Sequence, residues 1–310
     1  MPKKIIFMGT SMFAVPILKS LYQNGFPIVT VYTQPPQKSQ RGQKINKSPI
    51  QGISETLNLD CRTPQTLKNN SEEYEFIKEL KADLAIVVAY GKIIPKNILN
   101  LTKKGFINVH GSLLPKWRGA APIQRSIMNL DDETGISIMK INEELDSGPV
   151  SNIYKVKLKP SDNFQEVSEK LSLLAAEKIL DNIDTILDDK INFIDQDDSK
   201  ATYAKKIEKS EGKINWNDNA SHIIGKINGL YPIPGAFFIF NGERYKILKA
   251  EIGNGIGKIG EVIDKKLEIA CTNNQSIKVL EIQRQGKRVQ KIEEFILGSQ
   301  IKKGFIVNNV

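Results

Sequence analysis

The sequence predicts a doubly wound α/β domain followed by a smaller β-barrel domain. In the first part of the chain, continuous apolar segments alternate with helical patterns, as in a parallel sheet that helices cover on both faces. Beyond about Lys205, short alternating segments are separated by glycines, which is typical of a small barrel. With 310 residues, the chain is long enough for two domains with separate cores.

The first predicted elements are strands and helices in alternation. "IIFMG" at residues 5–9 predicts a short buried strand, and Thr10 or Ser11 is expected to cap a helix that runs to about Gln23. The β-branched stretch "IVTVYT" predicts the next strand. A polar segment at residues 34–48 then interrupts the pattern, and helices are expected near residues 49–57 and 72–80.

Two further apolar strands, "DLAIVVAYG" and "GFINVHG", extend the predicted sheet. "GISIMKI" and "GPVSNIYKVKL" predict a strand pair joined by the turn "NEELDS". A long helix is expected next, because Asn163 and Glu166 have capping-box spacing. Apolar residues then recur at the helical period, namely Val167, Leu171, Leu174, Ala175, Ile179, Ile183 and Ile186.

A polar, acidic stretch after this helix predicts a domain boundary. We expect a first domain at residues 1–188, a linker at residues 189–204 and a second domain at residues 205–310. One helix is expected in the second domain, near residues 219–229. Short strands are expected at "FFIF", "YKILKAEI", "GEVI", "LEIACT" and "SIKVLEI".

The positive charge is concentrated toward the end of the chain. The formal net charge is +9, and residues 201–310 carry 18 Lys and Arg against 11 Asp and Glu. Residues 1–200 are nearly balanced, with 26 against 24. Such asymmetry indicates a polyanionic partner, with nucleic acid the usual candidate. A surface tuned for solubility explains the charge equally well, so composition leaves both readings open.

Several classes of protein are excluded by the sequence. Cys61 and Cys271 lie far apart without neighbouring ligand types, so we expect no metal site and a reducing compartment. No apolar run reaches membrane-spanning length, and the first strand begins too early to leave room for a signal or transit peptide. The first strand ends in "GTSMFA", whose single glycine excludes the dinucleotide fingerprint.

The stretch "INVHGSLLPKWRGAAPIQ" at residues 107–124 carries the candidate site. Asn108 and His110 lie two residues apart at the end of a predicted strand, so their side chains share one face of the sheet. Histidine titrates near neutrality, and the asparagine amide can donate to a developing negative oxygen. Alternatively, His110 is satisfied by local backbone groups and Asn108 forms a turn. Asp146 lies in the acidic turn "EELDSGP" and gains a role only if the fold brings it to His110.

The longer motifs identify a family. "AYGKIIP", "INVHGSLLPKWRGAAPIQRSI", "ETGISIMKI" and "LDSGP" closely resemble the methionyl-tRNA formyltransferase family, as do "TQPPQKSQRGQKINKSPI" and "YAKKIEKSEGKINW". The resemblance implies transfer of a formyl group from 10-formyltetrahydrofolate to the methionine α-amine of initiator methionyl-tRNA. It also implies a Rossmann-like catalytic domain, a linker and an OB-like tRNA-binding domain. A monomeric, bacterial cytoplasmic enzyme without a metal, membrane or obligate protein partner is expected.

The resemblance also implies roles for individual residues. Asn108, His110 and Asp146 match the family's catalytic trio, with His110 acting either as base or as oxyanion partner. The folate-contacting segment corresponds to Ser112, Leu113, Leu114 and Pro115. The basic loop at residues 34–48 corresponds to the loop that enters the acceptor stem, with Lys38, Arg41, Lys44 and Lys47. The expected tRNA contacts of the second domain are Lys205, Lys206, Lys209 and Lys213.

Three other functions share part of this pattern. A sugar-amine formyltransferase would share the Asn-x-His pair and the aspartate, but it would not require "KWRGAAPIQ" or the basic second domain. A formyl-folate hydrolase or glycinamide ribonucleotide formyltransferase would generally have proline where this chain has Gly111. A non-catalytic RNA-binding protein would explain the charge and leave the candidate catalytic residues without a role.

Overall fold

The computed structural model describes residues 3–39 and 44–307, which form two compact units. Unit 1 consists of Met1–Pro122, Thr134–Val156 and Ser168–Ala204, and unit 2 of Ile123–Glu133, Lys157–Val167 and Lys205–Val310. Among the described residues, no helix is both long and apolar enough to cross a bilayer.

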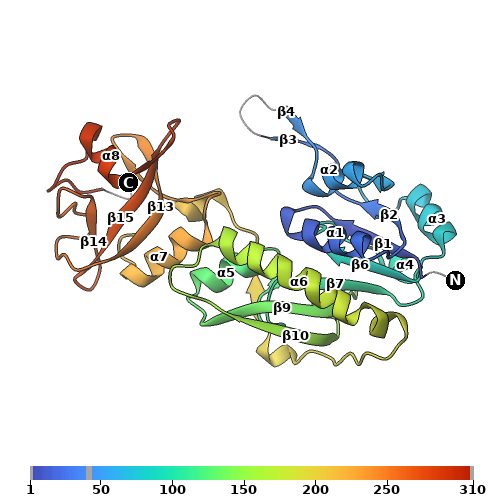
Figure 1. The fold of residues 1–310 in the computed structure, drawn as a ribbon. Coiled ribbons are helices and arrows are strands. Elements are labelled where there is room, and N and C mark those ends of the chain that lie inside the picture. The colour runs from blue at the N-terminus through green and yellow to red at the C-terminus, as the bar shows by residue number, and fades with distance from the viewer. Residues whose placement is uncertain (1–2, 40–43, 308–310) are drawn as a thin grey trace. The chain divides into compact units, whose positions relative to one another are not determined.

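A seven-stranded sheet is the centre of unit 1 (Figure 1). Its order is β10-β9-β7-β6-β1-β2-β5. The strands are β1 (Ile5–Gly9), β2 (Ile28–Tyr32), β5 (Cys61–Arg62), β6 (Leu84–Val88), β7 (Phe106–His110), β9 (Glu133–Lys140) and β10 (Val150–Lys157). The strands from β5 to β7 pair in parallel, and β9 runs antiparallel to β7. The residues of β1 and β6 are all buried, as their continuous apolarity predicts.

The remaining elements of this part connect or cover the sheet. The helices are η1 (Met12–Ala14), α1 (Val15–Gln23), α2 (Pro49–Thr56), α3 (Ser71–Leu80), α4 (Lys96–Leu99), α6 (Phe164–Leu187) and η2 (Asp198–Lys200), whereas α5 (Pro122–Met128) lies almost entirely in unit 2. The short strands are β3 (Gln37–Ser39), β4 (Lys44–Asn46), β8 (Arg118–Gly119) and β11 (Tyr203–Ala204).

The two predicted helix caps have different outcomes. The capping box before α6 is confirmed, because Asn163 and Glu166 each bond the other's backbone N–H, at 3.1 and 3.2 Å. The prediction that Thr10 or Ser11 caps the first helix is wrong. A 3₁₀ turn precedes α1, Ser11 makes no side-chain cap bond, and the Thr10 hydroxyl donates to the carbonyl of Tyr90 at 2.8 Å.

A buried polar cluster lies within the core of unit 1. The Tyr32 hydroxyl donates to the Glu73 carboxylate at 2.6 Å, and the Arg62 guanidinium donates to the same carboxylate at 2.8 Å. Glu73 is only 6% exposed, so these contacts replace most of its hydration. Burial, followed by the bond to Glu73, raises the pKa of Tyr32 above its usual range. The cluster fixes α3 to β2 and β5.

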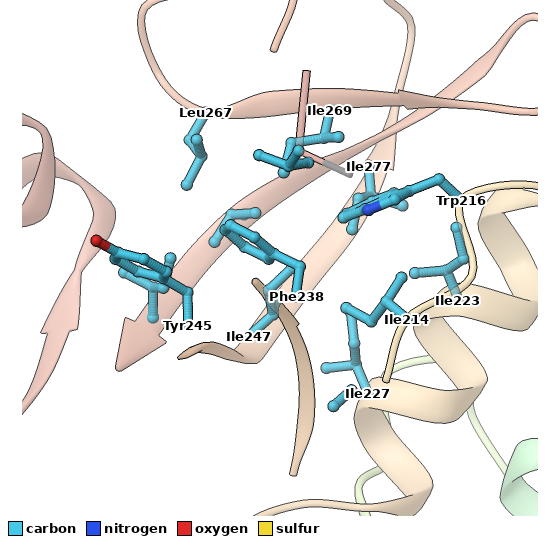
Figure 2. Packing of buried hydrophobic residues seen from close by; sticks show 14 of the residues in the cluster. Ile214, Trp216, Ile223, Ile227, Phe238, Tyr245, Ile247, Leu267, Ile269 and Ile277 are labelled. Carbon is cyan, nitrogen blue, oxygen red and sulfur yellow. The ribbon is translucent and has the colours of Figure 1, made fainter. Parts of the chain in front are cut away.

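Unit 2 is built on an antiparallel sheet with the order β12-β13-β15-β14, and β16 pairs with β15. The strands are β12 (Ala236–Phe240), β13 (Glu243–Gly253), β14 (Glu268–Cys271), β15 (Gln275–Arg284) and β16 (Val289–Lys291), and the helices are η3 (Lys209–Gly212), α7 (Ala220–Gly229) and α8 (Ile292–Gly298). Figure 2 shows the core, where Trp216 and Tyr245 flank Phe238 with ring centroids 6.2 and 5.5 Å away.

The fold class predicted from the sequence is confirmed as a mixed α/β sheet domain followed by an antiparallel β-sheet domain. Two details of unit 2 differ. The strand predicted at "GEVI" is wrong, because Glu261 and Val262 form only isolated bridges, to Ile306 and Ile269 respectively. Helix α8 was not predicted, because its seven residues are too few to display a helical period.

Candidate active site

The end of β7 carries the two polar side chains of the candidate site. Asn108 is half-buried and His110 is buried. The other three residues of β7 are apolar and buried. Strand β7 pairs with β6 on one side and β9 on the other, which fixes its backbone in the middle of the sheet. The two side chains therefore lie on one face, at positions that the sheet holds rigidly.

The turn between β9 and β10 brings Asp146 to these residues. One oxygen of its carboxylate accepts from the Asn108 amide at 3.3 Å, and the other lies 3.6 Å from Nδ1 of His110. Asp146 has a φ of +49°, an uncommon conformation for a residue with a side chain. The turn requires glycine at position 148, because a Cβ atom there would lie 1.9 Å from the carbonyl oxygen of Lys140. The structure thus brings together three residues that the sequence separates by up to 38 positions.

A second loop completes the surroundings of His110. Nε2 of His110 lies 2.9 Å from the carbonyl oxygen of Trp117, and the N–H of Gly119 donates to Asp146 at 2.9 Å. Nε2 therefore lies at hydrogen-bonding distance from a carbonyl oxygen, whereas Nδ1 faces the Asp146 carboxylate at 3.6 Å, which is within ion-pair distance but beyond hydrogen-bonding distance. Gly119 has a φ of +125°, and a Cβ atom there would lie 2.7 Å from the carbonyl oxygen of Ala204, so glycine is required.

The segment that matches the folate-contacting motif follows β7 directly. Ser112 is fully buried and donates to the carbonyl of Lys116 at 2.6 Å. The Ser137 hydroxyl donates to the Ser112 carbonyl and accepts from the Leu114 N–H, at 2.7 and 3.1 Å. Leu114 is buried, whereas Leu113 and Pro115 are half-buried. Ser112 and Leu114 therefore hold the loop, and the other two residues keep accessible surface.

Residues 194–204, which we call the strap, lie within unit 1 and bind both loops of the site. Strand β11 pairs in parallel with β8, and the Thr202 hydroxyl accepts from the Trp117 N–H at 2.9 Å. The Gln196 amide donates to the carbonyl of Asp146 at 2.9 Å. Residues 189–204 were expected to form a linker, and the role of the strap was not predicted. The signal in the sequence that could have revealed the strap was Arg118. If its guanidinium is buried within the motif, it requires partners from elsewhere in the chain.

The other two acids of the turn lie at the surface. Glu143 forms a 2.6 Å ion pair with Lys96, and both side chains are more than half exposed. Glu144 is also exposed. Among the described residues, neither carboxylate is hydrogen-bonded to Asn108 or His110, so both face water rather than the site.

The basic loop of unit 1 is described only in part. Lys38 and Lys44 lie on the short hairpin of β3 and β4, visible in Figure 1, while Arg41 lies outside the described residues. Lys47 follows the hairpin and pairs with Glu55 of α2 at 2.8 Å. The predicted tRNA-binding roles of these four residues remain predictions.

The four lysines predicted to bind tRNA in unit 2 lie where its main segment begins. Lys205, Lys206 and Lys209 are exposed, and Lys213 is half-buried beside Phe237. Arg125 of α5 donates to the carbonyl of Lys205 at 3.0 Å and pairs with Glu211 at 2.6 Å. The backbone that presents these lysines is therefore anchored within unit 2. Among the described residues, no group of three or more His, Cys, Asp or Glu side chains could hold a metal ion.

Comparison with known proteins assigns the chain to a family. Residues 3–183 match the family described as formyl transferase, and residues 206–300 match the formyl transferase C-terminal domain. Methionyl-tRNA formyltransferase of Pelagibacter ubique (strain HTCC1062) is 69% identical over 100% of both chains. The enzyme of the same name from Jannaschia sp. (strain CCS1) is 40% identical over 98% of this chain and 99% of its own.

Solved structures show the same fold at lower identity. The N-formyltransferase of Helicobacter canadensis, in complex with folinic acid and dTDP-3-aminofucose, has a TM-score of 0.70 and 20% identity over 90% of this chain and 99% of its own. The sugar 3N-formyl transferase WlaRD, with dTDP and 5-N-formyl-THF, has a TM-score of 0.68 and 20% identity over 93% of this chain and 100% of its own. Both family profiles and the full-length relatives agree, and the chain belongs to the methionyl-tRNA formyltransferase family.

Proposed function

We propose that Asn108, His110 and Asp146 catalyse transfer of a formyl group from 10-formyltetrahydrofolate to the methionine α-amine of initiator methionyl-tRNA. The amine nitrogen forms a bond to the formyl carbon, and the bond from that carbon to N10 of the folate breaks. The amine loses a proton and N10 gains one, so protons balance over the reaction. The site must therefore stabilise a tetrahedral oxyanion and accept a proton from the amine.

Asn108 and His110 are suited to stabilising the oxyanion. The Asn108 amide carries two N–H groups, and Asp146 accepts from only one of them, at 3.3 Å. Nε2 of His110 lies 2.9 Å from the Trp117 carbonyl oxygen and Nδ1 faces the Asp146 carboxylate, so neither nitrogen is left open to accept the amine proton, and a positive ring would stabilise a nearby negative oxygen through its field. Of the two roles open to His110, this geometry supports oxyanion stabilisation rather than general base catalysis.

Asp146 is suited to orienting the histidine and relaying the proton. Its carboxylate has 15% of its side-chain surface exposed, so water reaches it, whereas the His110 side chain is only 6% exposed. Asn108 and the Gly119 N–H hold its two oxygens in fixed directions. An incoming amine can therefore pass its proton through water to a carboxylate that does not have to reorient.

The folate is proposed to contact the accessible parts of residues 112–115. Leu113 and Pro115, which follow β7 closely in the chain, offer half-buried apolar surface, which suits an aromatic ring system. Ser112 and Leu114 face inward and hold the loop through Ser137. Among these residues, Leu113→Ala should raise the KM for folate more than it lowers kcat, because it removes binding surface without touching the oxyanion donors.

The tRNA is proposed to bind the basic hairpin loop and the lysines of the second domain. We propose residues 1–188 as the catalytic domain, 189–204 as a connection whose strap packs on that domain, and 205–310 as the tRNA-binding domain. Replacing Lys205, Lys206, Lys209 and Lys213 by alanine should weaken tRNA binding. The slope of log affinity against log salt concentration should become shallower by roughly 0.7–0.9 for each phosphate contact that is lost. An unchanged slope would mean that these lysines serve solubility only. Such an enzyme would work as a monomer in the bacterial cytoplasm, where charged initiator tRNA is made.

The convergence of Asn108, His110 and Asp146 is the observation that carries the catalytic proposal. Asn108→Ala and His110→Ala should each lower the formylation rate by ~10²–10³, the usual effect of removing one oxyanion-stabilising group. Folate binding, measured directly, should change much less. Rates close to wild type in both variants would show that the catalytic site lies elsewhere.

A further inference from the structure

The backbone around Asp146 is held from outside its own turn. The side-chain amide of Gln196 donates to the carbonyl of Asp146 at 2.9 Å and to the carbonyl of Gly148 at 2.7 Å. Just before it, Ile194 exchanges two backbone hydrogen bonds with Val150, at 2.8 and 2.9 Å. Four bonds from the strap therefore fix the turn whose carboxylate faces Asn108 and His110.

The orientation of the Gln196 amide is itself determined by a buried charge. Arg118 is only 3% exposed, and its guanidinium donates to the Gln196 carbonyl oxygen at 3.0 Å. A second guanidinium nitrogen pairs with Asp198 at 2.7 Å. Guanidinium groups only donate, so the oxygen of the Gln196 amide must face Arg118. Its NH₂ group must then face the two carbonyls of the turn.

We propose that Gln196 is a positioning residue for the carboxylate of Asp146 and that Arg118 sets the direction of its amide. This inference rests on the proposed catalytic role of Asp146. The turn needs such support because Asp146 has a φ of +49°, which the chain does not favour by itself. Gln196 and Arg118 thereby control the distance between the carboxylate and its partners.

A purely structural role for Gln196 would have different consequences. In that case its contact with Arg118 would matter most, and any substitution that kept this contact would preserve activity. Gln196→Glu makes the distinction. One carboxylate oxygen can still accept from Arg118, whereas the other would face the carbonyls of Asp146 and Gly148 and repel them.

The test measures kcat, KM and thermal stability for Gln196→Glu and Gln196→Ala, each alone and combined with Asp146→Asn. In the wild-type background, both substitutions should lower kcat by about 10- to 100-fold, because small displacements of a catalytic group have effects of this size. The KM values for folate and tRNA should change much less. In the Asp146→Asn background, neither substitution should lower kcat by more than about twofold, because residues that act through one another are not additive. Asp195→Asn, an exposed neighbour, should match the wild type.

The pH dependence of kcat gives an independent readout. The profiles of both Gln196 variants should move in the same direction as the profile of Asp146→Asn and by a smaller amount. Full activity in Gln196→Glu, or an undiminished loss of kcat in the Asp146→Asn background, would overturn the inference. If Gln196→Ala fails to fold, Gln196→Glu decides, because it retains the bond to Arg118. A wild-type enzyme that does not formylate methionyl-tRNA would instead refute the proposed function.

Discussion

Replacing Asp146 by asparagine tests the electrostatics of the site with almost no change in shape. The proposed oxyanion role gives His110 a positive charge in the transition state, and two unit charges 3.6 Å apart, the separation of the carboxylate and Nδ1 of His110, interact by about 4–5 kcal/mol at an effective dielectric constant of about 20. Only the part that grows in the transition state affects the rate. If about half of this interaction energy arises only in the transition state, Asp146→Asn loses ~2 kcal/mol of transition-state stabilisation, which lowers the rate about 30-fold.

The substitution also disturbs two hydrogen bonds. The Asp146 carboxylate accepts from the Asn108 amide and from the Gly119 N–H. An asparagine has one acceptor oxygen and would oppose one of these donors with its own N–H. A conflict of this kind costs about 1–3 kcal/mol, and together the two effects predict a loss of ~10²–10⁴ in kcat.

The assay compares initial rates of formylation at saturating folate and methionyl-tRNA for wild type, Asp146→Asn and Glu144→Gln. Glu144 is exposed, so its variant should stay within about twofold of wild type, as surface substitutions usually do. Thermal unfolding of all three proteins verifies the fold. An Asp146→Asn rate within about threefold of wild type, or an equally slow Glu144→Gln enzyme, would refute this reasoning about the carboxylate.

Other parts of the structure make separate predictions. Glu73→Gln should lower Tm by about 6–12 °C in a thermal scan, because breaking a buried ion pair costs about 3 kcal/mol; an unchanged Tm would contradict the buried cluster. The hydrogen bond from Arg125 lowers the pKa of Glu211. The ionised pair therefore stabilises the fold fully above the ordinary Glu pKa of about 4.3, and this stabilisation is lost as the pH falls through the lowered pKa. Arg125→Met should therefore lose less Tm than the wild type as the pH is lowered. If the Tm of both proteins fell in parallel, the pair would not be the source of this acid sensitivity. Trypsin should cut the basic loop at Lys38, Arg41 or Lys44, and initiator tRNA should protect it; equal cutting with and without tRNA would exclude an acceptor-stem role.

The sequence predicted the elements whose apolar residues are either continuous or periodic along the chain. The continuous apolarity of "IIFMG" and "LAIVV" identified strands covered on both faces, and both are fully buried. The spacing of Asn163 and Glu166 identified the start of α6. These features depend on residues that are near one another in the chain, which is why local patterns were sufficient.

Features that depend on distant contacts were not predictable from local pattern. The polar composition of residues 189–204 resembles that of a linker, and nothing in it reveals that Thr202 and Gln196 bond to the loops of the site. The meeting of Asp146 with His110 likewise depends on the antiparallel pairing of β9 with β7. The local pattern gave Asp146 a role only if the fold brought it to His110, and the family resemblance implied that role.

Detection of formylmethionine on initiator tRNA tests the central claim most directly. The purified protein should convert charged initiator tRNA to the formylated product when 10-formyltetrahydrofolate is added, and His110→Ala should form it ~10²–10³ times more slowly. A dTDP-linked amino sugar, offered as the alternative acceptor, should remain unmodified under the same conditions. Formylation of the sugar but not of the tRNA, or equal rates for wild type and His110→Ala, would contradict the account.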